Sequence, residues 1–105
     1  MSAQQVPNLT DLFAENLKEA EAGNLCAWAD VGYAYLYGMG TDQDIDKALG
    51  CFRKGAEAGD ARACYAIYET WSDGVSLVSE DEAMKMCRRA ASRGHKKAAF
   101  ALEQN

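Results

Sequence analysis

The chain has 105 residues, of which 49% are apolar and 26% charged, and this length and composition suit one soluble domain with a small hydrophobic core. Its net charge of -5 argues against nucleic acid as a partner, because phosphate binding draws its affinity from clustered Lys and Arg. The first residues lack the basic and apolar regions of a signal peptide, and no segment approaches the run of about 18 apolar residues that spans a bilayer. We therefore expect a cytoplasmic protein that neither crosses nor binds a membrane.

The first predicted element is a helix of about residues 9–22, which the side chain of Asn8 can cap. The tetrapeptide EAGN at 21–24 then returns as EAGD at 57–60, and this recurrence indicates an internal repeat. In both copies the glycine suits the left-handed end of one helix, and the following Asn or Asp suits the cap of the next. Each tetrapeptide is thus predicted to be a turn between helices.

The segment 24–59 is predicted to be the first full repeat, made of two helices. Apolar residues recur at helical spacing in both of its halves: Ala27, Val31 and Tyr35 in the first, and Ala48, Cys51, Phe52 and Gly55 in the second. The turn YGMGTDQD separates the halves. Gly38 and Gly40 can release the chain from the first helix, and Asp44 can cap the second.

The segment 60–94 is predicted to be the second repeat, offset from the first by 36 positions before an internal loop and by 35 after it. The missing residue falls between Gly74 and Ala83, where a loop tolerates a deletion. Ser79 and Glu82 predict a capping box at the next helix. The segment 95–105 then forms a C-terminal capping helix.

These elements predict one all-α domain over residues 1–105, in which an N-terminal helix (8–23) and the C-terminal helix flank two full helix-turn-helix repeats. Helices of about 9–15 residues are marginal alone, so stability must come from stacking. Alanines at repeated positions, such as Ala27, Ala63 and Ala98, permit close approach of the helices. Replacing Ala63 with Leu is expected to overpack such a seam.

The first repeat carries a recognisable pattern: Ala27-x3-Val31-Gly32-x2-Tyr35-x2-Gly38-x-Gly40, then Asp44-x2-Lys47-Ala48 and Arg53-Lys54-Gly55-Ala56-Glu57-x-Gly59. It resembles the Sel-1-like repeat, an α/α solenoid related to the tetratricopeptide repeat. The second repeat departs from the pattern, with Tyr68 in place of glycine and Trp71 in place of tyrosine. The resemblance implies a right-handed superhelix whose opening helices line a concave face that scaffolds or recognises other proteins and peptides.

A stripe on that concave face follows if each opening helix presents the positions that its core leaves free. The stripe comprises Cys26, Ala29, Tyr33, Leu36 and Tyr37, then Arg62, Tyr65, Glu69, Ser72 and Asp73, then Lys97 and Phe100. Because tyrosine-rich surfaces favour protein binding, we predict six partner-binding residues, Tyr33, Tyr37, Tyr65, Glu69, Lys97 and Phe100. The alternative is that Tyr33 and Tyr65 cover neighbouring helices. We assign Tyr35 and Trp71 to the core.

Residues with catalytic or metal-binding chemistry are few, and we predict no enzyme, no metal and no cofactor. The single histidine, His95, stands in the cap register of Asn24 and Asp60. The alternating aspartates at 42–46 lack the glycine and glutamate of a calcium loop. The four cysteines form no C-x-x-C pair, so we interpret them as reduced, buried thiols, with disulfides or a metal as the alternative.

The function that we predict is a protein–protein interaction module, an adaptor or scaffold that holds a peptide or helix of a partner in a shallow groove. The alternative is a small acidic inhibitor of the immunity type, which blocks a toxin or an enzyme; a hydrolase is the least favoured. The acidic balance suits a basic partner. A homodimer is a further alternative, since two repeats make only a short groove.

Overall fold

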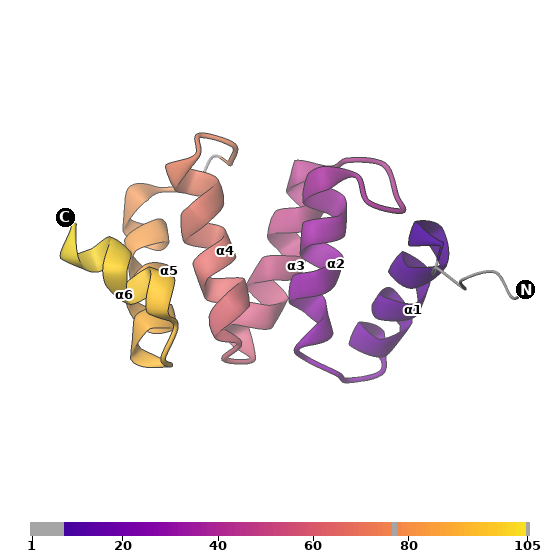
Figure 1. The fold of residues 1–105 in the computed structure, drawn as a ribbon, viewed down its shortest axis with the longest axis horizontal. Helices are drawn as coiled ribbons and strands as arrows, with labels where there is room; N and C mark the ends of the chain where they lie inside the picture. The colour runs from indigo at the N-terminus through magenta and orange to yellow at the C-terminus, as the bar shows by residue number, and fades with distance from the viewer. Residues whose placement is uncertain (1–7, 77, 105) are drawn as a thin grey trace, which may run out of the picture.

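The computed structural model describes residues 8–76 and 78–104, and every regular element among them is a helix. The order along the chain is α1 (Leu9–Glu21), α2 (Ala27–Tyr37), α3 (Ile45–Glu57), α4 (Ala61–Ser72), α5 (Glu80–Ser92) and α6 (Lys96–Glu103), as Figure 1 shows. The chain therefore forms an α/α solenoid, with two complete helix pairs flanked by α1 and α6, and the all-α prediction is confirmed. Residues 1–7, 77 and 105 of the predicted domain lie outside the described residues.

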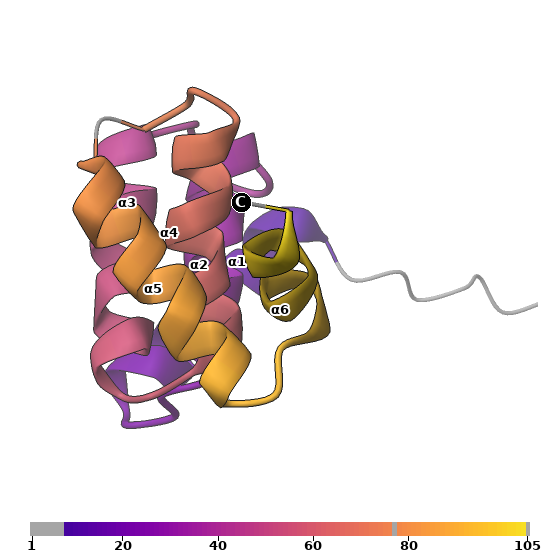
Figure 2. The same cartoon turned by 90° about the vertical axis from the view of Figure 1, so that its left-hand side faces the viewer.

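The molecule is elongated, with extents of 53 × 28 × 25 Å. The helices α1 and α6 lie at opposite ends of the long axis, and the two helix pairs stand side by side between them (Figure 1). Seen along the long axis, α3 and α5 form one layer and α2 and α4 another (Figure 2). The opening helices of the repeats thus share one side of the solenoid.

The predicted caps begin most of the helices. In each case a side chain accepts a hydrogen bond from a backbone N–H of the first turn: Asn8 from Thr10 (2.7 Å), Asp44 from Lys47 (3.0 Å), Asp60 from Arg62 (3.0 Å), Ser79 from Glu82 (3.1 Å) and His95 from Ala98 (3.3 Å). The turn glycines Gly23, Gly59 and Gly94 adopt φ angles of 110°, 90° and 90°. The prediction that EAGN and EAGD are inter-helix turns is confirmed.

The expected cap at Asn24 is wrong. The chain makes a further turn before α2, in which the N–H of Ala27 donates to the carbonyl of Asn24, so that Cys26 becomes the cap residue and offers no side-chain bond. The Asn24 amide instead donates to Glu19 Oε1 at 3.3 Å. The first opening helix therefore starts later than its counterpart α4 and lacks a side-chain cap.

The capping box at Ser79 is only half formed. Ser79 caps the helix, but the Glu82 carboxylate accepts from Arg53 of α3, at 2.8 Å and 3.0 Å, rather than from the Ser79 N–H. This bidentate ion pair joins the closing helices of the two repeats. It lowers the pKa of Glu82 and raises that of Arg53.

The core consists mainly of small residues around a few large ones. The ring of Phe52 in α3 is fully buried and lies against Gly32 of α2, where an added Cβ would meet the ring at 2.5 Å. Gly55 approaches Ala63 in the same way, since its Cβ would come within 2.7 Å of the alanine methyl. The seams between helices are thus tight enough that larger side chains would separate them.

The cysteines are free thiols. Cys51, Cys64 and Cys87 are buried as predicted, and burial raises the pKa of each thiol. Cys26 is exposed, so its interpretation as a buried residue is wrong. It lies in the extra turn before α2, outside the helical face that packs on the core. Across residues 8–76 and 78–104, none of the helices combines the length and apolarity needed to cross a membrane.

Candidate protein-binding surface

The opening helices bring four of the six predicted partner-binding residues into one open hollow of about 380 Å³. Tyr33 comes from α2, Tyr65 and Glu69 from α4, and Lys97 from α6, and the hollow is completed by Arg62, His95 and Lys96. Residues 64 positions apart thus meet because the helices that carry them stack in register.

A second open hollow, of about 470 Å³, adjoins the first and shares Tyr65, Lys96 and Lys97 with it. Phe100, the fifth predicted residue, lies in its lining and is 64% exposed. The sixth, Tyr37, is 63% exposed and stacks on Tyr33, with ring centroids 6.2 Å apart. We name the surface formed by the two hollows and Tyr37 the tyrosine surface.

Tyr33 links the two repeats at the centre of the tyrosine surface. Its hydroxyl donates to Glu69 Oε1 at 3.4 Å, and its ring packs edge-on against Phe52 with centroids 5.0 Å apart. Partial burial and the negative charge of Glu69 raise the pKa of Tyr33 far above its ordinary value. The hydroxyl therefore stays protonated and serves as a hydrogen-bond donor.

Tyr65 has a similar double role one repeat further on. Its ring stacks on His95 with centroids 4.4 Å apart and contacts Tyr68 at 5.8 Å. Burial raises the pKa of Tyr65 as well. Tyr33 and Tyr65 are both partly buried against the core, and each also lines a hollow. The two interpretations that the sequence left open therefore describe two sides of the same rings.

Arg62 positions α4 against α2 beside the hollows. Its guanidinium donates to the Cys26 carbonyl at 2.8 Å and to Asp30 at 3.3 Å, and it lies 3.9 Å from Asp60. The side chains of Arg62 and Asp30 are 49% and 48% exposed, so the ion pair between them adds little stability. Their effect is to orient Arg62, whereas Lys96 and Lys97, the other cations of the tyrosine surface, are exposed and form no ion pair with the described residues.

Two members of the predicted stripe do not reach the surface. Ala29 is 0% and Leu36 5% exposed, and both belong to the main core. The prediction fails because α2 packs against α1, α3 and α4 together, and this leaves a narrower exposed strip than a helix with two neighbours would keep. The core assignments of Tyr35 and Trp71 are confirmed, since both rings pack against buried residues.

An apolar hollow between α1 and α2 was not expected from the sequence. Leu9, Leu12 and Met39 are 52%, 41% and 45% exposed, and they line a space of about 190 Å³ together with Asp30 and Tyr33. The sequence did contain a signal for this hollow, because the first helix has more apolar residues than one packed face can hold. Phe13, Leu17 and Ala20 already fill the packing stripe.

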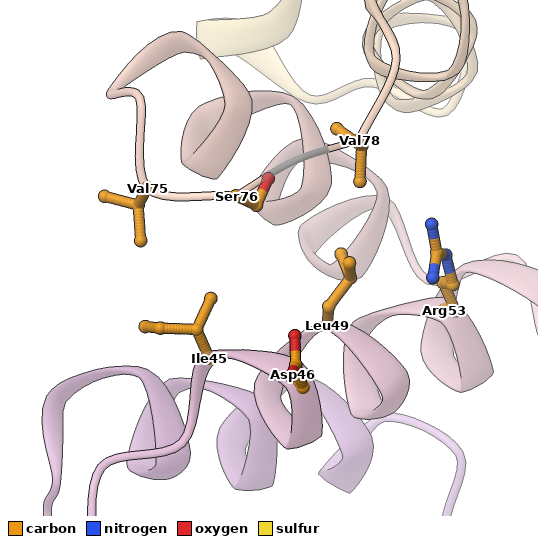
Figure 3. A pocket seen from close by; sticks show the side chains of 7 residues that line it. All are labelled: Ile45, Asp46, Leu49, Arg53, Val75, Ser76 and Val78. Atoms are coloured by element: carbon orange, nitrogen blue, oxygen red, sulfur yellow. The ribbon is translucent and has the colours of Figure 1, made fainter.

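A further hollow, of about 360 Å³, lies away from the tyrosine surface on the closing-helix layer (Figure 3). Ile45 and Leu49 of α3 point toward the segment that carries Ser76 and Val78, and Arg53 stands at one end. The Glu82 carboxylate already holds the Arg53 guanidinium. No predicted binding residue lies in this hollow.

The histidine has a structural partner. His95 Nδ1 accepts the N–H of Ala98 as the cap of α6, and burial together with the charge of Lys97 holds the pKa of His95 below its ordinary value. Among residues 8–76 and 78–104, no three His, Cys, Asp or Glu side chains group as metal ligands would, and this includes the aspartates at 42–46.

Comparison with known proteins gives one family match and similar solved structures. The model of the Sel1 repeat matches residues 27–60 and 71–95. A crystal structure of a Sel1 repeat protein from Oxalobacter formigenes is 29% identical, with a TM-score of 0.78 over 87% of this chain and 37% of that one. A protective antigen of uropathogenic Escherichia coli with an SLR fold is 21% identical, with a TM-score of 0.82 over 90% of this chain and 21% of that one. The chain thus spans well under half the length of either structure.

Proposed function

Because the chain belongs to the Sel1 repeat family, whose members are generally protein-interaction modules and typically non-catalytic, we propose that it binds a segment of another protein on the tyrosine surface. The observation that carries the proposal is the meeting of Tyr33, Tyr65 and Lys97 from three successive opening helices in one hollow. A groove built by three helices presents an extended set of contacts to one peptide or helix.

The exposed rings supply the apolar part of this binding. Tyr37 and Phe100 are each more than 60% exposed and lie on either side of the half-buried pair Tyr33 and Tyr65. Aromatic side chains bury a large area at low entropic cost, and they dominate interface energetics. The bound segment therefore presents apolar side chains toward these rings.

The charged residues of the tyrosine surface indicate which polar groups of the partner it would bind. Lys96 and Lys97 are exposed at its α6 end, whereas Glu69 is already bonded to the Tyr33 hydroxyl. The local charge favours a carboxylate of the partner over this end, although the net charge of the chain is -5. The expectation of a basic partner rests on that net charge, and we replace it with an apolar segment that carries an acidic group.

A capture experiment tests the proposal. Immobilised wild type and the variant Tyr37→Ala/Phe100→Ala are offered to the same lysate, and the bound proteins are identified by mass spectrometry. These rings are preferable to Tyr33 as targets, because Tyr33 packs on Phe52 and its loss would also weaken the fold. The matched control is Leu25→Ala/Val75→Ala, which removes side chains that are 50% and 44% exposed outside the tyrosine surface.

We expect a protein that wild type and control both retain and that the tyrosine-surface variant loses. Lys97→Glu should weaken capture of the same protein if an acidic group lies over α6. Equal capture by wild type and Tyr37→Ala/Phe100→Ala would place the binding elsewhere and overturn the proposal.

A further inference from the structure

The loops that join the two helices of a repeat differ between the repeats. The first loop runs from Gly38 to Asp44 and the second from Gly74 to Ser79, so the second is shorter by one residue. At an offset of 36, Ser76 of the second loop stands where the first loop has glycine. These differences change how each loop lies on the closing helix that precedes its repeat.

The first loop lies directly on the backbone of α1. Gly40 has a φ angle of 81°, and a Cβ added to it would overlap the carbonyl oxygen of Leu9. Glycine alone permits this left-handed backbone at no cost together with so close a contact. Leu9 shares its register with Ile45, so the corresponding place in the second repeat is the first turn of α3.

The second loop is held by α4 instead. The backbone N–H groups of Val75 and Ser76 both donate to the Thr70 carbonyl, at 2.9 Å and 3.2 Å. The hydroxyls of Thr70 and Ser76, both buried, are hydrogen-bonded at 3.1 Å. The first opening helix has Ala34 in the register of Thr70 and forms no such bond. Because Ser76 carries a Cβ, the second loop cannot make on α3 the contact that Gly40 makes on α1.

The hollow of about 360 Å³ on the closing-helix layer lies at this place, between α3 and the second loop (Figure 3). We name it the loop hollow. Its walls are apolar: Ile45 and Leu49 are partly buried, Val78 is 8% exposed and Val75 is 44% exposed. The first and last helices of the chain take no part in its lining. An apolar side chain that enters the loop hollow removes this surface from water.

The charged groups around the loop hollow are mostly carboxylates. Asp46 is exposed in its lining, and Glu80 and Asp81 are exposed in the first turn of α5. These three carboxylates form no ion pair with the described residues. Arg53, the cation of the lining, is already held by Glu82 of the same first turn. The acidic side chains therefore remain available to a partner.

The lysines near these carboxylates do not balance them. The ammonium group of Lys47 lies over the Tyr35 ring, 5.6 Å from its centroid. Lys85 follows Asp81 by one helical turn and balances one carboxylate at most. The local charge is thus negative, and it favours a cationic group of a partner.

We propose that the loop hollow binds an apolar side chain of a further protein partner, from a segment in which lysine or arginine flanks that side chain. The apolar side chain packs on Ile45, Leu49 and Val75, and the flanking cations face Asp46 and the first turn of α5. The loop hollow lies on the closing-helix layer and the tyrosine surface on the opening helices. The chain can therefore join two partners of opposite charge, as an adaptor does.

Two defined peptides test the proposal. One has a leucine between two pairs of lysines, and the other has the same leucine between two pairs of glutamates. Each peptide is titrated into the isotope-labelled full chain at low and high NaCl, and the amide chemical shifts are followed by NMR. We expect the lysine peptide to shift the amides of Leu49, Val75 and Val78. It should bind more weakly in concentrated NaCl, because salt screens the carboxylates.

Variants of the wall and of the charge locate the contact. Val75→Ser should raise the dissociation constant of the lysine peptide by roughly threefold to tenfold, since the wall loses an apolar side chain. Asp46→Lys should weaken binding by a similar factor. The matched controls are Leu25→Ser, at a residue 50% exposed outside both surfaces, and Asp11→Lys, in the first turn of another closing helix. Both controls should bind the lysine peptide as wild type does.

Circular dichroism of each variant separates loss of binding from loss of fold. The proposal would be overturned by shifts confined to other residues, by equal shifts of these amides with the two peptides, or by an unchanged dissociation constant in Val75→Ser. Tyr37→Ala/Phe100→Ala should bind the lysine peptide as wild type does. The loop hollow and the tyrosine surface are therefore tested independently.

Discussion

At one register position the two repeats differ in which helix carries the large side chain. In the first repeat the opening helix has a small residue and the closing helix a large one, and in the second repeat the sizes are exchanged. Gly32 of α2 makes room for the ring of Phe52, whereas Tyr68 of α4 takes the register of Gly32, and Cys87 of α5 that of Phe52. Phe52 and Cys87 are both 0% exposed. The comparison teaches that the glycine at this register accompanies a large buried residue in the closing helix, and that a small residue there is compatible with a tyrosine in the opening helix.

The exchange also affects the tyrosine surface. The Phe52 ring stays beneath α2, but the Tyr68 ring lies partly exposed against Tyr65 and Trp71, with centroids 5.8 Å and 5.9 Å apart. It therefore lines the second hollow, where the first repeat offers only glycine. The departure of the second repeat from the family pattern thus adds an aromatic contact to the proposed binding surface.

The largest effect is expected when Phe52, the largest fully buried side chain among the described residues, is removed. Phe52→Ala should lower the free energy of unfolding by about 3–5 kcal/mol, because it leaves a cavity against Gly32 that the helices cannot fill. Cys87→Ala, its counterpart in the second repeat, removes only a sulfur atom and should cost roughly 1 kcal/mol. Urea unfolding measures both. Equal losses of free energy of unfolding in the two variants would contradict the interpretation that the large side chain lies in the closing helix of the first repeat and in the opening helix of the second.

A somewhat smaller effect is expected from the other side of the same contact. Gly32→Ala places a Cβ at 2.5 Å from the Phe52 ring and should cost about 1–3 kcal/mol. In a Phe52→Cys background the same change should be neutral or stabilising by up to about 1 kcal/mol, since the space is then free and alanine favours helix. The coupling energy of this double-mutant cycle is the measurement. A coupling near zero would contradict the interpretation that the glycine accompanies the large buried residue.

The caps of the opening helices differ between the repeats by a lesser amount. Asp60→Ala removes the side-chain cap of α4 and should cost about 0.5–2 kcal/mol. Asn24→Ala, at the equivalent position, should change the free energy of unfolding by no more than a few tenths, because Asn24 caps nothing. Thermal unfolding of the two variants under identical conditions compares them. A larger loss in Asn24→Ala would mean that the extra turn before α2 depends on it.

The third member of this register, His95, should give the smallest effect, visible as a dependence on pH. Its pKa is lowered in the folded chain from an ordinary value of about 6.5, so the neutral form is favoured and stability is complete above that value. Stability is lost as the pH falls toward the lowered value, because the unfolded chain then binds a proton that the folded chain, whose Nδ1 accepts from Ala98, does not bind.

The midpoint of thermal unfolding is thus expected to decrease slightly more between about pH 7 and about pH 5 in wild type than in His95→Asn, which keeps a cap without a titrating group. If the midpoint of thermal unfolding changed equally with pH in the two proteins, His95 would not be the group responsible for the pH dependence. Asp60 and Glu69 act against the shift and keep it modest.

Much of the candidate site followed from periodicity. The offsets of 36 and 35 predict a stripe that joins Tyr33, Tyr65 and Lys97, and in the structure these residues line one hollow. The stripe was too wide at Ala29 and Leu36, because a helix with three neighbours buries more of its surface than periodicity alone reveals. The exposed Leu9 and Leu12 were missed for a related reason, since neither a spacing nor a motif says which neighbour is lacking.

By itself the sequence determined the elements that depend on neighbouring residues. The helical periods, the turn glycines Gly23, Gly59 and Gly94, and the caps at Asp44 and Asp60 all act within a few positions, so a local pattern is sufficient to predict them. Only the tertiary structure decided which side chains meet across helices. Two examples are the packing of the Phe52 ring against Gly32 and the ion pair between Arg53 and Glu82. Both depend on the packing distance between helices, and all the side chains between two helices set this distance together.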